Sequence, residues 1–392
     1  MTAKQLGIEM MVLGTSAPDF DLVIVGGSFA GLVAARTAAM RGLRVAVIDA
    51  KPEPGAALRT TGILVKEAAE VLDLPFSLTR KIHGVRLYAP SMRSVDLHSP
   101  GYFFLATETA ALLRWLAREA ALAGVELFYG CRFEGAQRAD GAIYLPGLDK
   151  RTRYLIGADG AHSAVARCFG LGRNRRFLTG VELELPGDAG LDPGYLHCFL
   201  DRRLAPGYIA WGVPGVGITQ IGLACRQGHR PDTAELLRKV APLTLLCRQK
   251  LLGRRAGPIP AGGLVRPFAS EGVLLIGDAA GLVSPMTAGG IHNAFHFARR
   301  AAQVVAEFLQ DQGPEPSRVL AREFPKYRLK SLGRQLLNLG PPDALFDLLI
   351  AVPAFQAFAR KVYFHHRLGL MAPTGSRYYR PAPKDLPTSP LR

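Results

Sequence analysis

The sequence predicts an α/β protein in which a three-layer domain with a parallel sheet is interrupted by an antiparallel sheet and followed by helices. Three observations lead to this fold class: an opening strand–helix–strand pattern, a middle region of short alternating strands, and a late return of buried strands. Alternation with period two indicates a sheet with one solvated face, whereas continuous apolar runs indicate strands buried on both faces. The two patterns therefore predict two different sheets.

The chain opens with a strand, a helix and a second strand. Residues 21–26 place an apolar Leu-Val-Ile-Val run before a glycine, which is typical of a strand buried in a parallel sheet. The alanine-rich helix that follows ends at Gly42, and a second apolar strand is expected at residues 44–49. This pattern is the βαβ unit of a Rossmann-like dinucleotide-binding domain.

Later segments alternate between the two kinds of sheet. Residues 84–99 predict a hairpin of the antiparallel sheet. Further short strands of the same kind, separated by Pro and Gly, are expected at residues 180–226. Between them a helix is expected from Thr107, its cap, to Ala123. The Rossmann pattern returns at residues 272–278 and precedes an amphipathic helix. The cofactor domain is therefore interrupted and resumes late.

These patterns divide the chain into a discontinuous cofactor domain, an inserted substrate domain and a C-terminal part. The cofactor domain is expected to comprise residues 20–80, 100–175 and 260–312. The substrate domain is expected to comprise residues 81–99 and 176–259. Residues 313–371 should form a helical region and residues 372–392 a Pro-rich tail.

The composition is that of a globular protein with an excess of positive charge. Among 392 residues, 48 Lys and Arg exceed 32 Asp and Glu, a formal net charge of +16. This balance favours an anionic partner, although it is equally typical of an Arg-rich surface. No basic run interleaved with aromatics is present, so nucleic-acid binding is not expected. Five single cysteines without a CxxC pair or Cys/His cluster predict no metal site and fit a cytoplasmic protein.

No segment reads as a signal peptide or as a membrane span. The apolar patch at residues 10–13 lacks a basic head and a long apolar stretch. Residues 344–359 are interrupted by polar residues and are shorter than the roughly 20 residues that a bilayer span needs. Their apolar positions, followed by Arg360 and Lys361, suit peripheral contact with anionic lipid or, alternatively, packing against the cofactor domain.

The first βα turn reads Gly-Gly-Ser-Phe-Ala-Gly from Gly26 to Gly31, where a dinucleotide fold expects GxGxxG. The first glycine permits the tight turn, and the last lets the helix pack closely while its N-terminus faces a pyrophosphate. Ser28 replaces the middle glycine and is still small enough for a phosphate to approach. The binding candidates here are Gly26, Ser28, Phe29, Ala30 and Gly31. The alternative is a Gly-rich turn without a ligand.

Asp49 ends the second strand about twenty residues beyond the glycines, where a carboxylate can accept both hydroxyl hydrogens of a ribose. Ala50 follows it and is included among the binding candidates. A carboxylate at this place argues against a ribose 2′-phosphate. A helix-capping or surface role for Asp49 is the alternative.

Two further motifs carry a family resemblance. They read Gly-Ala-Asp-Gly-Ala-His-Ser-Ala-Val-Ala-Arg at residues 157–167 and Gly-Asp-Ala-Ala-Gly-Leu-Val-Ser-Pro at residues 277–285. With the first turn, they resemble the FAD-dependent hydroxylase superfamily that has the para-hydroxybenzoate hydroxylase-like fold. Residues 277–294, which include Pro-Met-Thr-Ala-Gly-Gly-Ile, more closely resemble the geranylgeranyl reductase branch. Three motifs in this order are far more specific than any one of them.

The resemblance implies non-covalent FAD and a role for each motif. Asp278 of the Gly277-Asp278 pair would accept hydrogen bonds from the ribityl chain. Gly289 and Gly290 would approach the flavin ring, with Ile291 opening the helix. Asp159 would lie near the pyrophosphate, or would serve only as a structural Asp-Gly turn.

A resemblance to the substrate cavity of prenyl reductases is carried by the stretch Pro-Gly-Tyr-Ile-Ala-Trp-Gly-Val-Pro at residues 206–214. It implies that Tyr208, Trp211 and Pro285 line an apolar cavity, whereas the alternative is ordinary core packing. The archaeal reductases carry an Arg-Cys-Gly segment, where this chain has Arg59-Thr-Thr-Gly62. Arg59 therefore remains a cofactor candidate, but any role of that cysteine is absent.

Two activities are compatible with these motifs. The favoured one is reduction of carbon–carbon double bonds in an isoprenoid or other lipid-like substrate, with hydride delivered by the flavin. The alternative is a monooxygenase acting on an aromatic or polyketide-like substrate. No second dinucleotide turn is present, so a transient NAD(P)H or a ferredoxin-type protein is expected as electron donor. No catalytic side chain is assigned beyond His292, a candidate acid–base group near the flavin.

Overall fold

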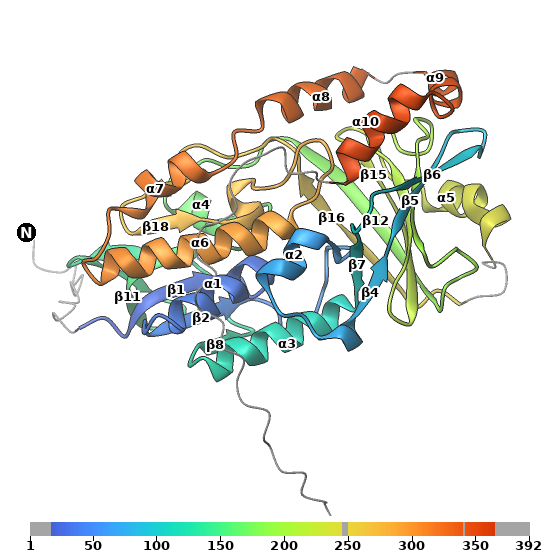
Figure 1. The fold of residues 1–392 in the computed structure, drawn as a ribbon. Helices are drawn as coiled ribbons and strands as arrows, with labels where there is room; N and C mark the ends of the chain where they lie inside the picture. Colours follow the sequence, from blue (N-terminus) through green and yellow to red (C-terminus); the bar gives the residue numbers. More distant parts are fainter. Residues whose placement is uncertain (1–16, 245–249, 340–341, 365–392) are drawn as a thin grey trace, which may run out of the picture.

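The computed structural model describes residues 17–244, 250–339 and 342–364. Within these ranges the strands form an eight-stranded sheet, a seven-stranded sheet and a three-stranded sheet. Figure 1 shows the eight-stranded sheet and the seven-stranded sheet side by side, with a line of C-terminal helices along both. The apolar patch at residues 10–13 and the Pro-rich tail lie outside the described residues.

The eight-stranded sheet is built on parallel strands in the order β18, β11, β1, β2 and β8. Their bounds are Val273–Leu275, Lys150–Gly157, Phe20–Val25, Val45–Asp49 and Glu126–Tyr129. Antiparallel strands β17 (Ala269–Ser270), β10 (Ala142–Leu145) and β9 (Gln137–Ala139) extend it. Leu22, Val23 and Ile24 of β1 have no exposed surface, as expected for a strand covered on both faces.

Three helices pack together beside this sheet. Helix α1 (Phe29–Ala39) contacts both α3 (Thr109–Leu122) and α6 (Ile291–Leu309), and Figure 1 shows α1 between them. The α1–α6 contact is anchored by an edge-to-face pair of buried rings, Phe29 and Phe295, with centroids 5.4 Å apart. The first helix of the described chain therefore packs against a helix that begins more than 250 residues later.

The seven-stranded sheet has the order β16, β12, β15, β14, β13, β5, β6. In that order the bounds are Gly253–Pro260, Phe177–Pro186, Ile218–Arg226, Ala210–Pro214, Tyr195–Phe199, Gly84–Tyr88 and Ser94–His98. Only the β13–β5 pair is parallel. The hairpin predicted at residues 84–99 is confirmed as β5 and β6, and it belongs to this second sheet.

A small sheet joins the two large ones. Strand β7 (Phe104–Thr107) pairs with β3 (Ile63–Val65) and with β4 (Thr79–Ile82). The shorter elements are α2 (Lys66–Val71), η1 (Phe76–Leu78), α4 (Ala164–Cys168), α5 (Thr233–Val240), η2 (Ala241–Leu243) and η4 (Gly277–Ala280).

The prediction that Thr107 caps a helix is wrong. Helix α3 begins at Thr109, and the Glu108 carboxylate accepts the Ala111 backbone N–H. Thr107 instead ends strand β7, where its hydroxyl donates to the Gly62 carbonyl at 2.8 Å. Because strand pairing fixes the position of Thr107, the next residue, Glu108, accepts the helical N–H and serves as the N-cap.

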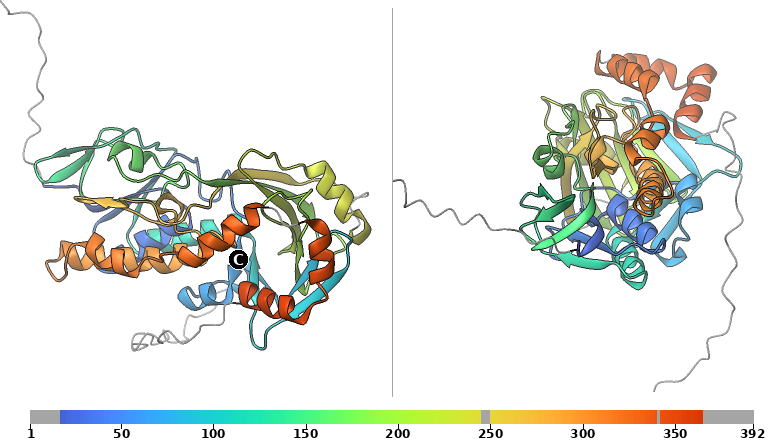
Figure 2. Two further views of the ribbon diagram at one scale, coloured as in Figure 1. Left: turned by 90° about the horizontal axis from the view of Figure 1, so that it is seen from above. Right: turned by 90° about the vertical axis from the view of Figure 1, so that its left-hand side faces the viewer.

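The C-terminal helices are α7 (Pro316–Glu323), α8 (Arg328–Leu339), α9 (Asp343–Leu349) and α10 (Pro353–Tyr363). Figure 2 shows them running from the side of α6 to the seven-stranded sheet. Ile350, Ala359 and Phe364 are buried there in one cluster with residues of β5, β6, β13 and β14. The predicted α/β fold with C-terminal helices is confirmed. In the described part of the chain, no helix combines the length and apolarity that crossing a bilayer requires.

Replacing Phe295 with Ala should lower the free energy of unfolding by roughly 3–5 kcal/mol, because it leaves a cavity between α1 and α6. Phe295 is fully buried, whereas Phe76 is 83% exposed. The control Phe76→Ala should therefore change stability by no more than about 0.5 kcal/mol. Urea unfolding of both variants measures the difference, and equal effects would contradict the packing described.

Candidate functional site

Three motifs far apart in the sequence meet at one edge of the parallel sheet. The Gly26 N–H donates to the Ile48 carbonyl at 2.8 Å, and the Ala158 N–H donates to the Val25 carbonyl at 2.7 Å. The Ile276 N–H in turn donates to the Gly157 carbonyl at 2.9 Å. These bonds align the carboxyl ends of β2, β1, β11 and β18. This is the edge at which open α/β sheets bind their ligands.

Two glycines of the first turn are required by close backbone contacts. A Cβ on Gly31 would lie 1.8 Å from the Gly26 carbonyl oxygen. A Cβ on Gly26, whose φ is +111°, would lie 2.3 Å from the Ala158 carbonyl oxygen. Ser28 occupies the N-cap position of α1 without a side-chain bond to the helix. The turn is thus pressed onto the end of β11, with the N-terminus of α1 facing outward from it.

Asp49 lies beside this turn at the end of β2. Its Oδ2 accepts the Gly27 N–H at 2.7 Å, and its Oδ1 accepts the Lys51 N–H at 2.8 Å. Each carboxylate oxygen can accept a second hydrogen bond, so these bonds fix the side chain and leave acceptor capacity for ribose hydroxyls.

Tyr129 is a neighbour of Asp49 that the sequence did not reveal. It stands directly opposite Asp49 in the β2–β8 pairing, and a Cβ on Gly27 would lie 3.2 Å from its hydroxyl. The hydroxyl is buried without a hydrogen-bond partner among the described residues, and desolvation raises its pKa to about 12. A buried hydroxyl that lacks a partner suits a site whose ligand supplies one. Only the strand order brings Tyr129 here.

Asp278 lies on η4 at the inner end of the same edge. Its side chain is exposed to solvent on one side, and desolvation by the segments packed around it raises its pKa to about 6. A Cβ on Gly290 would lie 3.4 Å from its Oδ1, so Asp278 and the Gly289–Gly290 pair are neighbours. Helix α6 begins at Ile291, as predicted.

Asp159 forms hydrogen bonds with the backbone at the start of α4. Its Oδ2 accepts the N–H groups of Ala164 and Val165 at 2.6 and 3.1 Å, at the start of α4. Its Oδ1 is buried without a hydrogen-bond partner in the described chain, and desolvation raises its pKa. Asn174 links this motif to η4, since its side-chain amide donates to the Asp278 carbonyl at 2.8 Å.

Buried polar side chains tie the Arg59–Gly62 segment to the seven-stranded sheet. The Arg255 guanidinium donates to the Thr60 carbonyl at 2.9 Å. Glu182 forms a side-chain hydrogen bond with Thr61 and accepts the Trp211 indole N–H at 3.1 Å. Desolvation raises the pKa of this buried carboxyl. In the sequence Glu182 is merely a polar residue within a largely apolar strand. The fold shows that its carboxylate binds Thr61 and Trp211.

The aromatic candidates lie next to the loop that precedes α6. The Tyr208 hydroxyl donates to the Thr287 carbonyl, and the Tyr208 ring meets Trp211 edge-on with centroids 6.5 Å apart. Pro285 is buried in the same loop. His292, on the first turn of α6, stacks on His296 with centroids 6.2 Å apart. The residues predicted to line the cavity therefore adjoin those predicted to hold the flavin.

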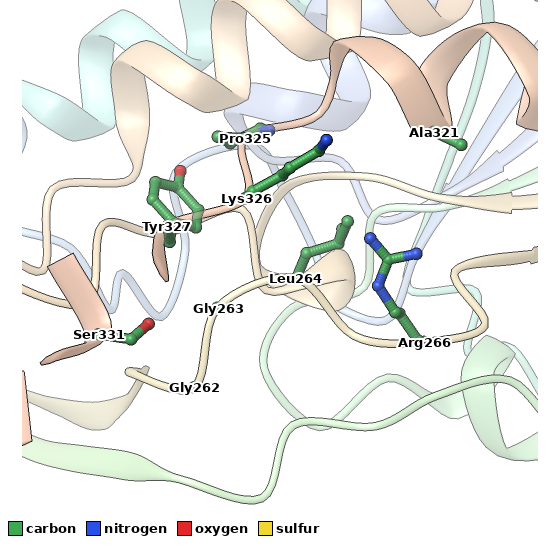
Figure 3. Close-up of a pocket in the computed structure, with 9 residues that line it drawn as sticks. All are labelled: Gly262, Gly263, Leu264, Arg266, Ala321, Pro325, Lys326, Tyr327 and Ser331. Atoms are coloured by element: carbon green, nitrogen blue, oxygen red, sulfur yellow. The ribbon is translucent and has the colours of Figure 1, made fainter. Parts of the chain in front are cut away.

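Two pockets open near these motifs but are not lined by the predicted residues. One, of about 450 Å³, lies between the Gly262–Leu264 segment and the start of α8, with Arg266 and Lys326 at its walls (Figure 3). The other, of about 240 Å³, contains Ala279 of η4 together with Arg167, Arg173 and Arg175.

Comparisons with known proteins agree with this geometry. Residues 24–86 match the family model described as an NAD(P)-binding Rossmann-like domain. The chain is 29% identical over 345 residues to digeranylgeranylglycerophospholipid reductase of Methanothrix thermoacetophila, covering 81% of this chain and 84% of that protein. It is 28% identical over 327 residues to geranylgeranyl diphosphate reductase of Rhodobacter capsulatus, covering 78% and 80%.

Solved structures share most of the architecture. A geranylgeranyl bacteriochlorophyll reductase-like protein from Thermoplasma acidophilum superimposes with a TM-score of 0.76 at 25% identity, covering 88% of this chain and 96% of that one. The p-nitrophenol 4-monooxygenase of Pseudomonas putida, at 15% identity, shares the fold with a TM-score of 0.68 and coverage of 88% and 97%.

The chain therefore contains a Rossmann-like domain and shares its fold with flavoproteins, and these similarities imply a flavin cofactor. The similar proteins include two geranylgeranyl-type reductases and a geranylgeranyl bacteriochlorophyll reductase-like structure, in agreement with the resemblance that the motifs carry. The residues present fit such a ligand: the unpartnered Tyr129 hydroxyl, the glycine turn and the Asp278 carboxyl lie along one edge.

Replacing Asp278 with Asn should change the pH dependence of stability. Because the folded-state pKa of about 6 exceeds the ordinary value of 3.8, the folded protein holds this proton more tightly than the unfolded chain. The wild type therefore loses stability as the pH rises from about 4 to 6, a loss that Asn cannot show. In urea unfolding of flavin-free protein, the free energy of unfolding of the variant minus that of the wild type should be larger at pH 7 than at pH 4.5. Equal differences at both pH values would contradict this.

Proposed function

We propose that the chain is an FAD-dependent reductase of carbon–carbon double bonds in an isoprenoid or lipid-like substrate. The observation that supports this most directly is the contact between Tyr208 and Thr287, since it joins the aromatic segment at the start of β14 to the loop expected beside the flavin ring. The relatives from Methanothrix and Rhodobacter are both named as reductases of geranylgeranyl compounds. An aromatic, partly apolar wall next to a flavin suits such a substrate.

The FAD would extend along the carboxyl edge of the parallel sheet. Asp49 and Tyr129 would face the adenosine ribose, the N-terminus of α1 the pyrophosphate, and Asp278 the ribityl chain. The full proposed set is Gly26, Ser28, Phe29, Ala30, Gly31, Asp49, Ala50, Arg59, Tyr129, Asp159, Gly277, Asp278, Gly289, Gly290 and Ile291. With this assignment we also propose that the chain is divided, as expected from the sequence, into a cofactor domain and an inserted substrate domain.

When bound and reduced, the flavin would supply a hydride to one carbon of the double bond, and a proton from water or from a side chain such as His292 would complete the reduction at the other carbon. The protein's part is to orient the double bond and to exclude water. Tyr208 is held by its bond to Thr287, and Trp211 is held by Glu182, so both rings present fixed faces to a substrate. Glu182 also fastens the Arg59–Gly62 segment, which keeps the cofactor edge and the substrate sheet in register.

The test is anaerobic turnover. Dithionite-reduced, FAD-loaded protein mixed with a geranylgeranyl substrate should yield a product heavier by two hydrogens per reduced bond, measured by mass spectrometry. Gly31→Ala is the control, because its Cβ would overlap the Gly26 carbonyl and should abolish flavin binding. A product that forms only with oxygen and contains it would instead establish the monooxygenase alternative. Purified protein that takes up no flavin would overturn both activities.

We also propose that the protein is cytoplasmic, receives electrons transiently from NAD(P)H or a ferredoxin-type donor, and touches membranes through α9 and α10. Leu348 is 70% exposed and Phe358 is 54% exposed, and Leu345 and Val352 beside them are also exposed. Arg360 and Lys361 in the last turn of α10 suit an anionic surface.

The double variant Leu348→Asp/Phe358→Asp should reduce co-sedimentation with phosphatidylglycerol-containing vesicles by roughly 10-fold or more, because two apolar anchors are lost. Phe76→Asp serves as the matched control, since Phe76 is exposed on η1. Binding by the double variant that equals the wild type would show that α9 and α10 do not contact the membrane.

A further inference from the structure

Helix α8 carries a buried cation that is not neutralised. Arg334 is only 5% exposed, and both of its terminal nitrogens, Nη1 and Nη2, are buried without a hydrogen-bond partner among the described residues. No carboxylate in the described ranges forms an ion pair with it. Desolvation accordingly lowers its pKa. Its one described charge-stabilising contact is a cation–π contact with the Tyr208 ring, which satisfies none of its N–H groups, so this guanidinium suits a site where an anion arrives from outside.

The position of Arg334 relates it to the proposed substrate cavity. The guanidinium lies 5.6 Å from the centre of the Tyr208 ring, the ring that is fixed to the loop before α6. Gly333, the preceding residue, packs on that loop as well, since a Cβ there would lie 2.7 Å from the Met286 methyl carbon. Arg334 thus faces the junction between β14 and the residues expected beside the flavin.

A second unpartnered group lies one turn further along α8. Asn338 is four residues beyond Arg334 and therefore on the same face of the helix. Its side-chain oxygen is buried without a partner in the described chain, while its backbone carbonyl accepts a bond from Arg226. Rotation of its amide would present an N–H donor in place of the oxygen. Lys330, four residues before Arg334, adds a second positive charge to this face.

We propose that Arg334, with Asn338 beside it, binds the anionic phosphate end of the lipid-like substrate. This assignment rests on the proposed function, because it takes the ligand to be the molecule that is reduced. A guanidinium presents a planar fork of N–H donors that matches two phosphate oxygens, and the surrounding burial strengthens that interaction. A diphosphate ester and a phosphodiester lipid share this chemistry. Anchoring the phosphate end would determine which part of the substrate's hydrocarbon tail lies against Tyr208.

The experiment uses FAD-loaded wild type, Arg334→Met and Arg334→Lys. Inorganic diphosphate is titrated calorimetrically, and turnover is measured with geranylgeranyl diphosphate, a digeranylgeranyl phospholipid and geranylgeraniol, which has no phosphate. In Arg334→Met, diphosphate affinity should fall, and KM for the phosphorylated substrate should rise, on the order of 10- to 100-fold. The KM for geranylgeraniol should change less than about 3-fold, and Arg334→Lys should recover part of the loss. Whichever phosphate substrate loses most identifies the natural head group.

The matched control is Arg322→Met, which removes an exposed cation from the neighbouring helix α7 and should leave all of these values unchanged. In the absence of ligand, Arg334→Met should melt no lower than the wild type, because an unpaired buried charge has been removed. Unchanged diphosphate affinity, equal losses for all substrates, weaker FAD binding or a lowered melting temperature would each overturn the proposal. If the wild type reduces none of the substrates, the proposed function fails, while the diphosphate titration still decides the role of Arg334.

Discussion

The packing of the Gly26–Gly31 turn against the end of β11 is the constraint on which the rest of the site depends. Backbone atoms occupy the places where side chains would stand at both glycines, so the turn, α1 and β11 can adopt only one relative position. Helix α6 then rests on α1 through Phe29 and Phe295, which places Ile291 and the preceding glycines at the same sheet edge. A close approach at two residues thereby positions a segment that lies about 260 residues further along the chain.

The junction between the two large sheets is held by polar groups rather than by apolar packing alone. Glu182 and Arg255 reach from the seven-stranded sheet to the Arg59–Gly62 segment, and Tyr208, in the segment just before β14, donates a hydrogen bond to the Thr287 carbonyl. Hydrogen bonds in a buried setting are directional, so they fix geometry where an apolar contact would tolerate sliding. Such rigidity suits a site that must present a double bond to a flavin at one distance.

Several buried polar atoms that the described chain does not satisfy lie along the edge of the parallel sheet and at this junction. Tyr129, Asp159, Arg334 and Asn338 each have a buried atom without a partner, and the first three lie near the proposed adenosine, pyrophosphate and head-group ends of the ligands. Native proteins seldom bury such groups without compensation, so these four residues are candidates for contact with a ligand.

The sequence by itself determined the α/β class, the glycine turn, Asp49 and the return of the Rossmann pattern before α6, because these depend on local periodicity and on backbone freedom at single residues. It placed Thr107 wrongly as a cap, since a strand pairing with Ile63–Val65 and Thr79–Ile82 outweighed a local preference. Tyr129, Glu182 and Arg334 became visible only in the tertiary structure. Their neighbours come from strands and helices distant in sequence, and burial without a partner is a property of the assembled fold that no local pattern encodes.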